Sequence, residues 1–106
     1  MKIISWNVNG VRAVAKKGLL DIIRELNPDI MCFQETKAQP DQVQEVFDGL
    51  NGYHVFSNSA EKKGYSSTAI ISKEPPLSVV NDMGIAIHDT EGRVMAAEFN
   101  DFYVVT

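Results

Sequence analysis

The chain has 106 residues, a formal charge of −4 from 10 basic and 14 acidic side chains, 44% hydrophobic residues and one cysteine. This size predicts one small domain, and a lone cysteine excludes an internal disulfide or a cysteine metal cluster. No apolar run approaches the roughly 20 residues of a membrane-spanning helix, and the N-terminus becomes polar too early for a signal peptide, so we expect a soluble, cytoplasmic protein with no membrane partner.

The first third of the chain predicts a strand, a helix and a second strand. Residues 3–8 form a short β-branched run closed by Asn9-Gly10, which suits a strand that ends in a tight turn. Apolar residues then recur every three or four positions until Pro28, which predicts an amphipathic helix. Residues 29–34 are continuously apolar in their middle, as in a strand covered on both faces. Such connections are almost always right-handed crossovers, so we expect the two strands to lie parallel in one sheet.

The remainder of the chain predicts one more helix and then mostly strands. Residues 40–50 place apolar side chains on one helical face, with Pro40 in the first turn. The later strand-like runs are residues 53–56, 68–71, 77–80, 93–99 and 102–105. Asn100-Asp101 predicts a hairpin between the last two strands, and His88 beside Asp89 predicts a surface turn. The fold class is therefore α/β.

The last predicted strand, residues 102–106, reaches the final residue without a turn or a polar tail. Natural domains rarely close in this way, because their termini usually fray as exposed polar segments. We therefore expect residues 1–106 to be the N-terminal part of a single domain that is truncated in a strand. An open strand edge favours pairing with a complementary C-terminal part, or self-association.

Two polar residues lie where the predicted parallel strands end. Asn7 and Glu35 are each at or just past a strand's carboxyl end, where open α/β sheets bind ligands. Carboxylate and amide oxygens are hard ligands that Mg²⁺ or Mn²⁺ accepts, together with waters and substrate phosphates. The alternative is an exposed Glu at a strand end and an Asn that caps the turn after it. Position and residue type alone leave both interpretations open.

Four segments follow one another in a distinctive order. They are residues 6–13 (Trp-Asn-Val-Asn-Gly-Val-Arg-Ala), 28–37 (Pro-Asp-Ile-Met-Cys-Phe-Gln-Glu-Thr-Lys), 64–70 (Gly-Tyr-Ser-Ser-Thr-Ala-Ile) and 91–94 (Glu-Gly-Arg-Val). In order and spacing they resemble the N-terminal motifs of the exodeoxyribonuclease III and apurinic/apyrimidinic (AP) endonuclease family. The resemblance implies a two-sheet α/β sandwich flanked by helices, the DNase I-like fold, of which this chain holds the N-terminal half.

The resemblance also implies an activity. Members hydrolyse DNA phosphodiesters with Mg²⁺ during base excision repair, cutting 5′ of abasic sites, and the motifs do not show whether this or 3′–5′ exonuclease action dominates. The expected partner is double-stranded DNA with abasic sites or 3′ ends. By resemblance, Glu35 is the principal metal ligand and Asn7 lies beside the metal and the scissile phosphate. Both are the expected catalytic and metal residues, and Asn9 supports their site.

Other positions match the DNA-contacting loops of the family. With Asn9, they are Gly10, Arg12 and Ala13 on one loop, Lys37 after the metal-binding Glu, and Gly64 and Tyr65 on a third loop. Arg and Lys would bond phosphates, and glycines would let the backbone approach closely. Ser67 stands where many relatives have Gly, which leaves the shape of the third loop open. Arg93 is interpreted as a structural partner of the turn and not as a catalytic residue.

The family's catalytic base and phosphate-binding His belong to segments that follow the matched region, so we expect this chain alone to be nearly inactive. Two alternatives remain open. A sibling phosphoesterase that acts on phospholipids shares the placement of the Asn and Glu, although residues 34–37 and 64–66 favour DNA. The second alternative is a non-catalytic fragment that self-associates through its open strand edge.

Overall fold

The computed structural model describes residues 1–82 and 90–106. Its elements in chain order are β1 (Ile3–Asn7), α1 (Val11–Ala15), α2 (Leu19–Leu26), β2 (Ile30–Gln34), α3 (Pro40–Phe47), β3 (His54–Asn58), β4 (Thr68–Ser72), β5 (Ser78–Asn81), β6 (Met95–Glu98) and β7 (Tyr103–Val105). None of the helices in these ranges has the length and apolarity needed to cross a bilayer.

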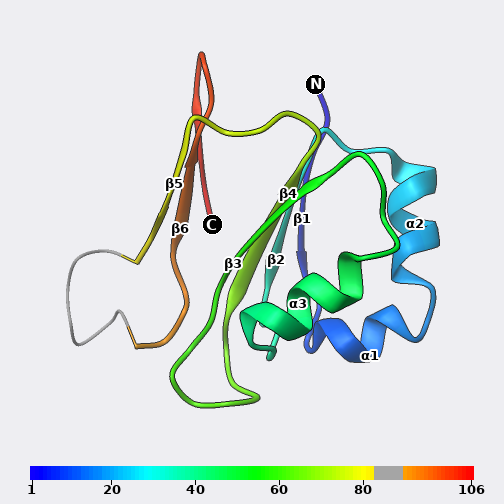
Figure 1. Cartoon of the computed structure of the whole chain (residues 1–106), viewed down its shortest axis with the longest axis vertical. Coiled ribbons are helices and arrows are strands. Elements are labelled where there is room, and N and C mark those ends of the chain that lie inside the picture. The colour runs from blue at the N-terminus through cyan, green and yellow to red at the C-terminus, as the bar shows by residue number, and fades with distance from the viewer. Residues whose placement is uncertain (83–89) are drawn as a thin grey trace.

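The strands form two sheets. The first has the order β1-β2-β4-β3, with β1 parallel to β2 and the other neighbours antiparallel. The second has the order β5-β6-β7 and is antiparallel throughout. Figure 1 shows the three helices on one side of the four-stranded sheet and the second sheet on its other side. The predicted α/β sandwich and the parallel pairing of the first two strands are confirmed.

Strand β2 is buried because both of its faces are covered. Met31 and Phe33 point toward the helices, where Phe33 lies 5.3 Å from the ring of Phe47 on α3. The alternate residues Ile30 and Cys32 pack against the second sheet. Burial raises the pKa of the Cys32 thiol to about 11, so the thiol stays protonated at neutral pH. The continuous apolar run in the sequence is thus explained by cores on both sides of one strand.

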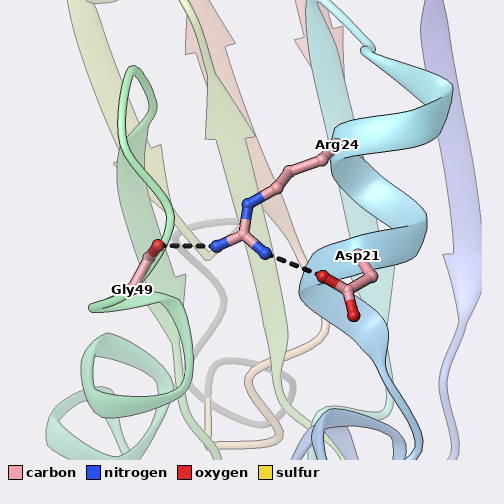
Figure 2. Close-up of polar contacts among 3 residues, drawn as sticks. All are labelled: Asp21, Arg24 and Gly49. Atoms are coloured by element: carbon pink, nitrogen blue, oxygen red, sulfur yellow. Dashed lines mark hydrogen bonds and ion pairs between the residues drawn. The ribbon is translucent and has the colours of Figure 1, made fainter.

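Helices α2 and α3 are limited by their flanking residues. Asn27 ends α2 in a left-handed conformation, φ 49°, directly before Pro28, and Gln39 and Gln42 form a capping box at the start of α3. Figure 2 shows how Arg24 connects the two helices. Its guanidinium donates to Asp21 Oδ1 at 2.9 Å on α2 and to the carbonyl of Gly49 at 2.8 Å, just past the end of α3.

The structure corrects the end of the second predicted helix and adds one short helix. The helix expected to reach residue 50 ends at Phe47, because residues 48–49 and 51–52 form turns. The turn predicted at Asn9-Gly10 leads directly into α1, which sequence periodicity did not reveal. The hairpin between β6 and β7 is confirmed, with the N–H of Phe99 donating to the carbonyl of Phe102 at 2.9 Å. The turn predicted at residues 88–89 lies outside the described residues.

Candidate functional site

Asn7 and Glu35 meet at one end of the four-stranded sheet, the lower end in Figure 1. Asn7 is the last residue of β1 and pairs in register with Gln34, the last residue of β2, so Glu35 follows directly beside it. The amide Nδ2 of Asn7 donates a hydrogen bond to Glu35 Oε2. The amide Oδ1 of Asn7 accepts the backbone N–H of Asn9 at 3.1 Å. Parallel pairing therefore brings the predicted catalytic residues into direct contact.

In this geometry, Asn7 and Glu35 have different roles. Both ends of the Asn7 amide are engaged, so Asn7 orients the Glu35 carboxylate and its Oδ1 faces the Asn9 N–H. Oε1 of Glu35 accepts no hydrogen bond from residues 1–82 or 90–106. No group of three or more His, Cys, Asp or Glu side chains with metal-binding geometry exists in the described part of the chain. A single oriented carboxylate fits Mg²⁺, which typically uses one or two carboxylates and completes its shell with waters and phosphate oxygens.

Backbone hydrogen bonds tie three loops together around this carboxylate. The N–H groups of Gly10 and Val11 donate to the carbonyls of Glu35 and Thr36 at 2.8 and 2.9 Å. On the other side, Thr36 and Lys37 donate to the segment before β4, at 3.1 and 2.9 Å. Residues 35–37, here called the Glu35 loop, are therefore fixed on both sides by backbone hydrogen bonds.

Strained backbone conformations concentrate in the same loops. Seven described residues other than glycine have positive φ, and five of them lie here: Asn9, Glu35, Lys37, Ser66 and Ser67. Such conformations persist only where the surroundings enforce them, and they cluster at functional sites. Ser67 has φ 76°, the region that glycine adopts easily. Ser67 thus adopts a φ that favours glycine, the residue that the resemblance places here in many relatives.

Basic side chains gather beside the Glu35 loop. Lys37 Nζ donates to Asn9 Oδ1 at 2.6 Å, and Arg12 donates to the backbone carbonyl of Lys37 at 3.0 Å. An open groove of about 780 Å³ runs between α1 and α3. Its lining residues are Gly10, Arg12, Ala13, Ala15, Lys16, Lys37, Gln42, Glu45, Val46 and Gly64. A local basic surface therefore exists on a chain whose net charge is −4.

The structure brings most of the predicted DNA-contacting residues to this groove. Gly10, Arg12, Ala13, Lys37 and Gly64 line it, whereas Tyr65 lines a neighbouring groove with Lys62. Lys16 extends the first groove, and Lys63 lines an adjoining one together with Arg12. The sequence places these two lysines in short polar stretches, residues 16–17 and 62–63, whose loops could converge on one face with Arg12 and Lys37, although solvated surface charge is the alternative for each one. The structure brings Lys16 and Lys63 to the same grooves as Arg12, although the sequence does not select them as DNA-contacting residues.

The sequence and the structure resemble those of known proteins. The model of the Endonuclease/Exonuclease/phosphatase family matches residues 4–106. The chain is 50% identical over 107 residues to an exodeoxyribonuclease from Bacillus subtilis and 45% identical over 108 residues to the DNA repair nuclease APEX1 from Danio rerio. Among solved structures, it resembles an AP endonuclease from Archaeoglobus fulgidus with a TM-score of 0.83 and 31% identity.

These matches include nearly all of this chain and a minor part of each relative. The alignments contain 100% of the chain but 41% of the B. subtilis protein and 35% of the D. rerio protein. The structural match includes 99% of the chain and 39% of the A. fulgidus protein. The chain thus spans about two fifths of the length of these three relatives, and the family resemblance inferred from the sequence motifs is confirmed.

Proposed function

Since this chain belongs to the Endonuclease/Exonuclease/phosphatase family, we propose that it supplies the metal-binding carboxylate and part of the DNA surface of a Mg²⁺-dependent DNA-repair phosphodiesterase. The observation that carries the proposal is the contact of Asn7 with Glu35 beside a groove with basic residues. The names of the relatives, an exodeoxyribonuclease, a DNA repair nuclease and an AP endonuclease, favour DNA as the substrate. The activity that we propose is cutting 5′ of abasic sites, with 3′–5′ exonuclease action as a further activity.

In the proposed reaction, the residues of this chain bind and orient. Glu35 holds the metal through its carboxylate, Asn7 fixes the direction of that carboxylate, and Asn9 fixes the Asn7 amide through its backbone N–H. Bound Mg²⁺, or Mn²⁺ in its place, supplies positive charge at the phosphoryl oxygen and the leaving 3′ oxygen. The strained, hydrogen-bonded loop keeps the carboxylate in place, so little reorganisation is needed when substrate arrives.

The groove between α1 and α3 is the proposed path of a DNA backbone. Arg12 and Lys16 are exposed on its wall, and Lys37, two residues after Glu35, also lines it. Gly10 and Gly64 have no side chains that would keep a phosphate at a distance. Contacts of this kind fix the register of the DNA and carry no base specificity, which suits a site defined by a missing base.

We propose that the whole activity requires more residues than this chain contains. The relatives are more than twice as long as the stretch they share with it. The catalytic base and the phosphate-binding His expected for the family are then contributed by a complementary part, and the isolated chain is nearly inactive. Residues that act as a unit in catalysis lose most of their effect when one of them is missing.

A second candidate, self-association, is favoured by exposed apolar side chains on the outer strands of the two sheets. Tyr103 and Val105 on β7 are 68% and 67% exposed, and Ile3 on β1 is 50% exposed. Within the described ranges, β7 pairs only with β6 and β1 only with β2. Such edges pair with other chains unless they are covered.

The test is incision of a duplex that carries one abasic-site analogue. A chimera is made in which this chain replaces the stretch of the B. subtilis exodeoxyribonuclease that it matches. We expect Mg²⁺-dependent cutting 5′ of the site that chelator or Glu35→Gln abolishes and that Glu25→Gln, on the remote helix α2, leaves unchanged. If the folded chimera leaves abasic DNA intact with both Mg²⁺ and Mn²⁺, the proposal is wrong, and phospholipid phosphodiesters are the next substrates to test.

A further inference from the structure

Arg93 directly follows a turn that is fixed against the loop before β4. Gly92 is buried with φ 62°, and a Cβ at this position would lie 2.5 Å from the backbone nitrogen of Ala60. The hydroxyl of Thr68 donates to the Gly92 carbonyl at 3.0 Å, and the N–H of Glu61 donates to the carbonyl of Thr90 at 2.9 Å. The backbone that carries Arg93 is therefore held in contact with both ends of the loop formed by residues 60–67.

From this turn, Arg93 reaches the ring and the hydroxyl of Tyr65. The guanidinium donates to the Tyr65 hydroxyl at 2.9 Å, and its central carbon lies 5.7 Å from the ring centroid. Lys62 Nζ lies 5.4 Å from the same centroid. Cations at these distances are attracted to the face of an aromatic ring. Arg93 thus contributes both a hydrogen bond and a ring contact, whereas Lys62 contributes only the latter.

Tyr65 is connected in turn to the loop that carries Glu35. The Ser67 hydroxyl donates to the Tyr65 carbonyl at 3.1 Å and accepts the N–H of Ala60 at 2.9 Å. The residues after Tyr65 offer their carbonyls to the Glu35 loop, where Lys37 and Thr36 donate at 2.9 and 3.1 Å. A continuous series of contacts therefore runs from Arg93, through Tyr65 and the two serines, to the residues that follow Glu35.

We propose that Arg93 is a positioning residue that holds Tyr65, and through it the loop of residues 60–67, against the Glu35 loop. The expected effect of Arg93 on DNA affinity rests on the proposed function. The coupling between the two loops does not. The competing role for an exposed guanidinium beside this surface is a direct bond to a DNA phosphate. The two roles differ in what Tyr65→Phe does, because this change removes the hydroxyl that Arg93 bonds and leaves the charge of Arg93 in place.

The first measurement is backbone amide hydrogen exchange of the free chain by NMR. We expect Arg93→Ala and Tyr65→Phe each to accelerate exchange at Thr36 and Lys37 roughly three- to tenfold, the effect of one lost hydrogen bond. The double variant should show no further acceleration, and the amides of β2 should be unchanged. Lys73→Gln, which removes a remote cation, is the control. Unchanged exchange at Thr36 and Lys37 in Arg93→Ala would overturn the proposal, whatever the chain does with DNA.

The second measurement is affinity for an abasic-analogue duplex as a function of salt. We expect Tyr65→Phe to weaken binding, and Arg93→Ala to weaken it at least as much, because the second change removes the ring contact as well as the hydrogen bond. The double variant should bind no more weakly than Arg93→Ala, and none of the variants should change the salt dependence. A direct phosphate contact would instead lower the slope of log affinity against log salt by about 0.9 in Arg93→Ala alone, and this result would overturn the positioning role. If the unmodified chain binds no duplex, the proposed DNA surface fails, while the exchange measurement still decides the coupling.

Discussion

At the scale of single residues, the site depends on how Asn7 holds Glu35. The amide of Asn7 bonds one carboxylate oxygen of Glu35, and the Asn9 N–H bonds the other end of the same amide. We expect Glu35→Gln to abolish Mg²⁺ binding to the chain and Asn7→Ala to weaken it about 10- to 100-fold, the usual cost of losing a group that orients a metal ligand. Mg²⁺ titration followed by NMR shifts of the Asn9 and Gly10 amides measures both effects.

The remote Glu25→Gln variant is the matched control for this titration, since it removes a carboxylate from the exposed face of α2. Equal Mg²⁺ affinity in the unmodified chain and in Glu35→Gln would show that the metal lies elsewhere. Equal affinity in the unmodified chain and in Asn7→Ala would show that Glu35 needs no orienting partner.

Ser67 combines an unfavourable backbone conformation with two favourable side-chain bonds. Its φ is 76°, and its hydroxyl connects the Ala60 N–H to the Tyr65 carbonyl. We expect Ser67→Ala to lower the free energy of unfolding by about 1–3 kcal/mol, because a buried N–H loses its partner. Ser67→Gly loses the same bonds but relieves about 1 kcal/mol of backbone strain, so it should be the milder change. Urea unfolding of the three proteins tests this order, and a glycine variant less stable than the alanine variant would contradict it.

Sequence reasoning located some of the residues at the site better than others. Asn7 and Glu35 could be placed together because the parallel strands that carry them end at the same edge, a consequence of local patterns and the crossover rule. The contact of Arg93 with Tyr65 joins residues 28 positions apart on irregular segments. No periodicity describes such segments, so Arg93 was recognised only as a partner for a turn. The hydrogen bonds at the two ends of the Asn7 amide could not be predicted either, because they depend on the backbone conformation of the loops.

At the scale of elements, the turn at Gly92 holds the segment before β6, in the second sheet, against the residues that end and follow β3, in the first. Gly92→Ala would place a Cβ 2.5 Å from a backbone nitrogen and 2.8 Å from the Asn58 carbonyl oxygen, which cannot move without disturbing the end of β3. We expect this change to cost about 3 kcal/mol or more of unfolding free energy, as overpacking adds to the positive-φ penalty.

Gly18 provides the matched control because it has φ 94° with nothing within 4 Å of an added Cβ. Gly18→Ala should therefore show the backbone penalty alone, about 1 kcal/mol. Denaturant unfolding of both variants separates the two contributions. Equal losses would mean that the segment around Gly92 shifts freely and does not fix the two sheets relative to each other.

Elements with regular hydrophobic patterns were predicted well, and short or irregular ones were not. The pattern of α2 is strong because Leu19 and Ile23 face the core on a regular helical spacing. Helix α1 has five residues and buries only Val11, and Gly10 before it provides no side-chain cap. The sequence signal at Asn9-Gly10 is that of a turn, and the backbone indeed bends at Asn9, with positive φ at both residues. The helix after it forms through packing against α2 and α3, which local sequence does not encode.

At the scale of the whole molecule, the arrangement of the antiparallel strands was beyond local patterns. Strand β4 inserts between β2 and β3, so that Cys32 pairs in register with Ile70 and Phe56 with Ile70 on the other side. This order depends on contacts between distant segments, and several orders satisfy the same alternation of apolar residues. The division into two sheets followed from the family resemblance and not from the residues themselves.

The outer strands of the two sheets lead to a prediction about assembly. Gln34 on β2 donates to both Ser5 on β1 and Thr106 at the end of β7, so the open edges lie near each other. Exposed apolar side chains on such edges favour pairing with further strands, whereas a lysine on an edge strand opposes it.

We therefore expect the apparent mass of the isolated chain to rise with concentration in light scattering coupled to gel filtration. Val105→Lys should keep the isolated chain monomeric at all concentrations, because a charge on β7 must lose its hydration when another strand pairs there. Ile22→Lys removes an apolar side chain that is 38% exposed on α2, away from both edges, and should leave the association unchanged. If both lysine variants abolish association, general surface apolarity drives it. If neither does, the copies meet at another surface and the edge strands are left for a complementary part of the domain.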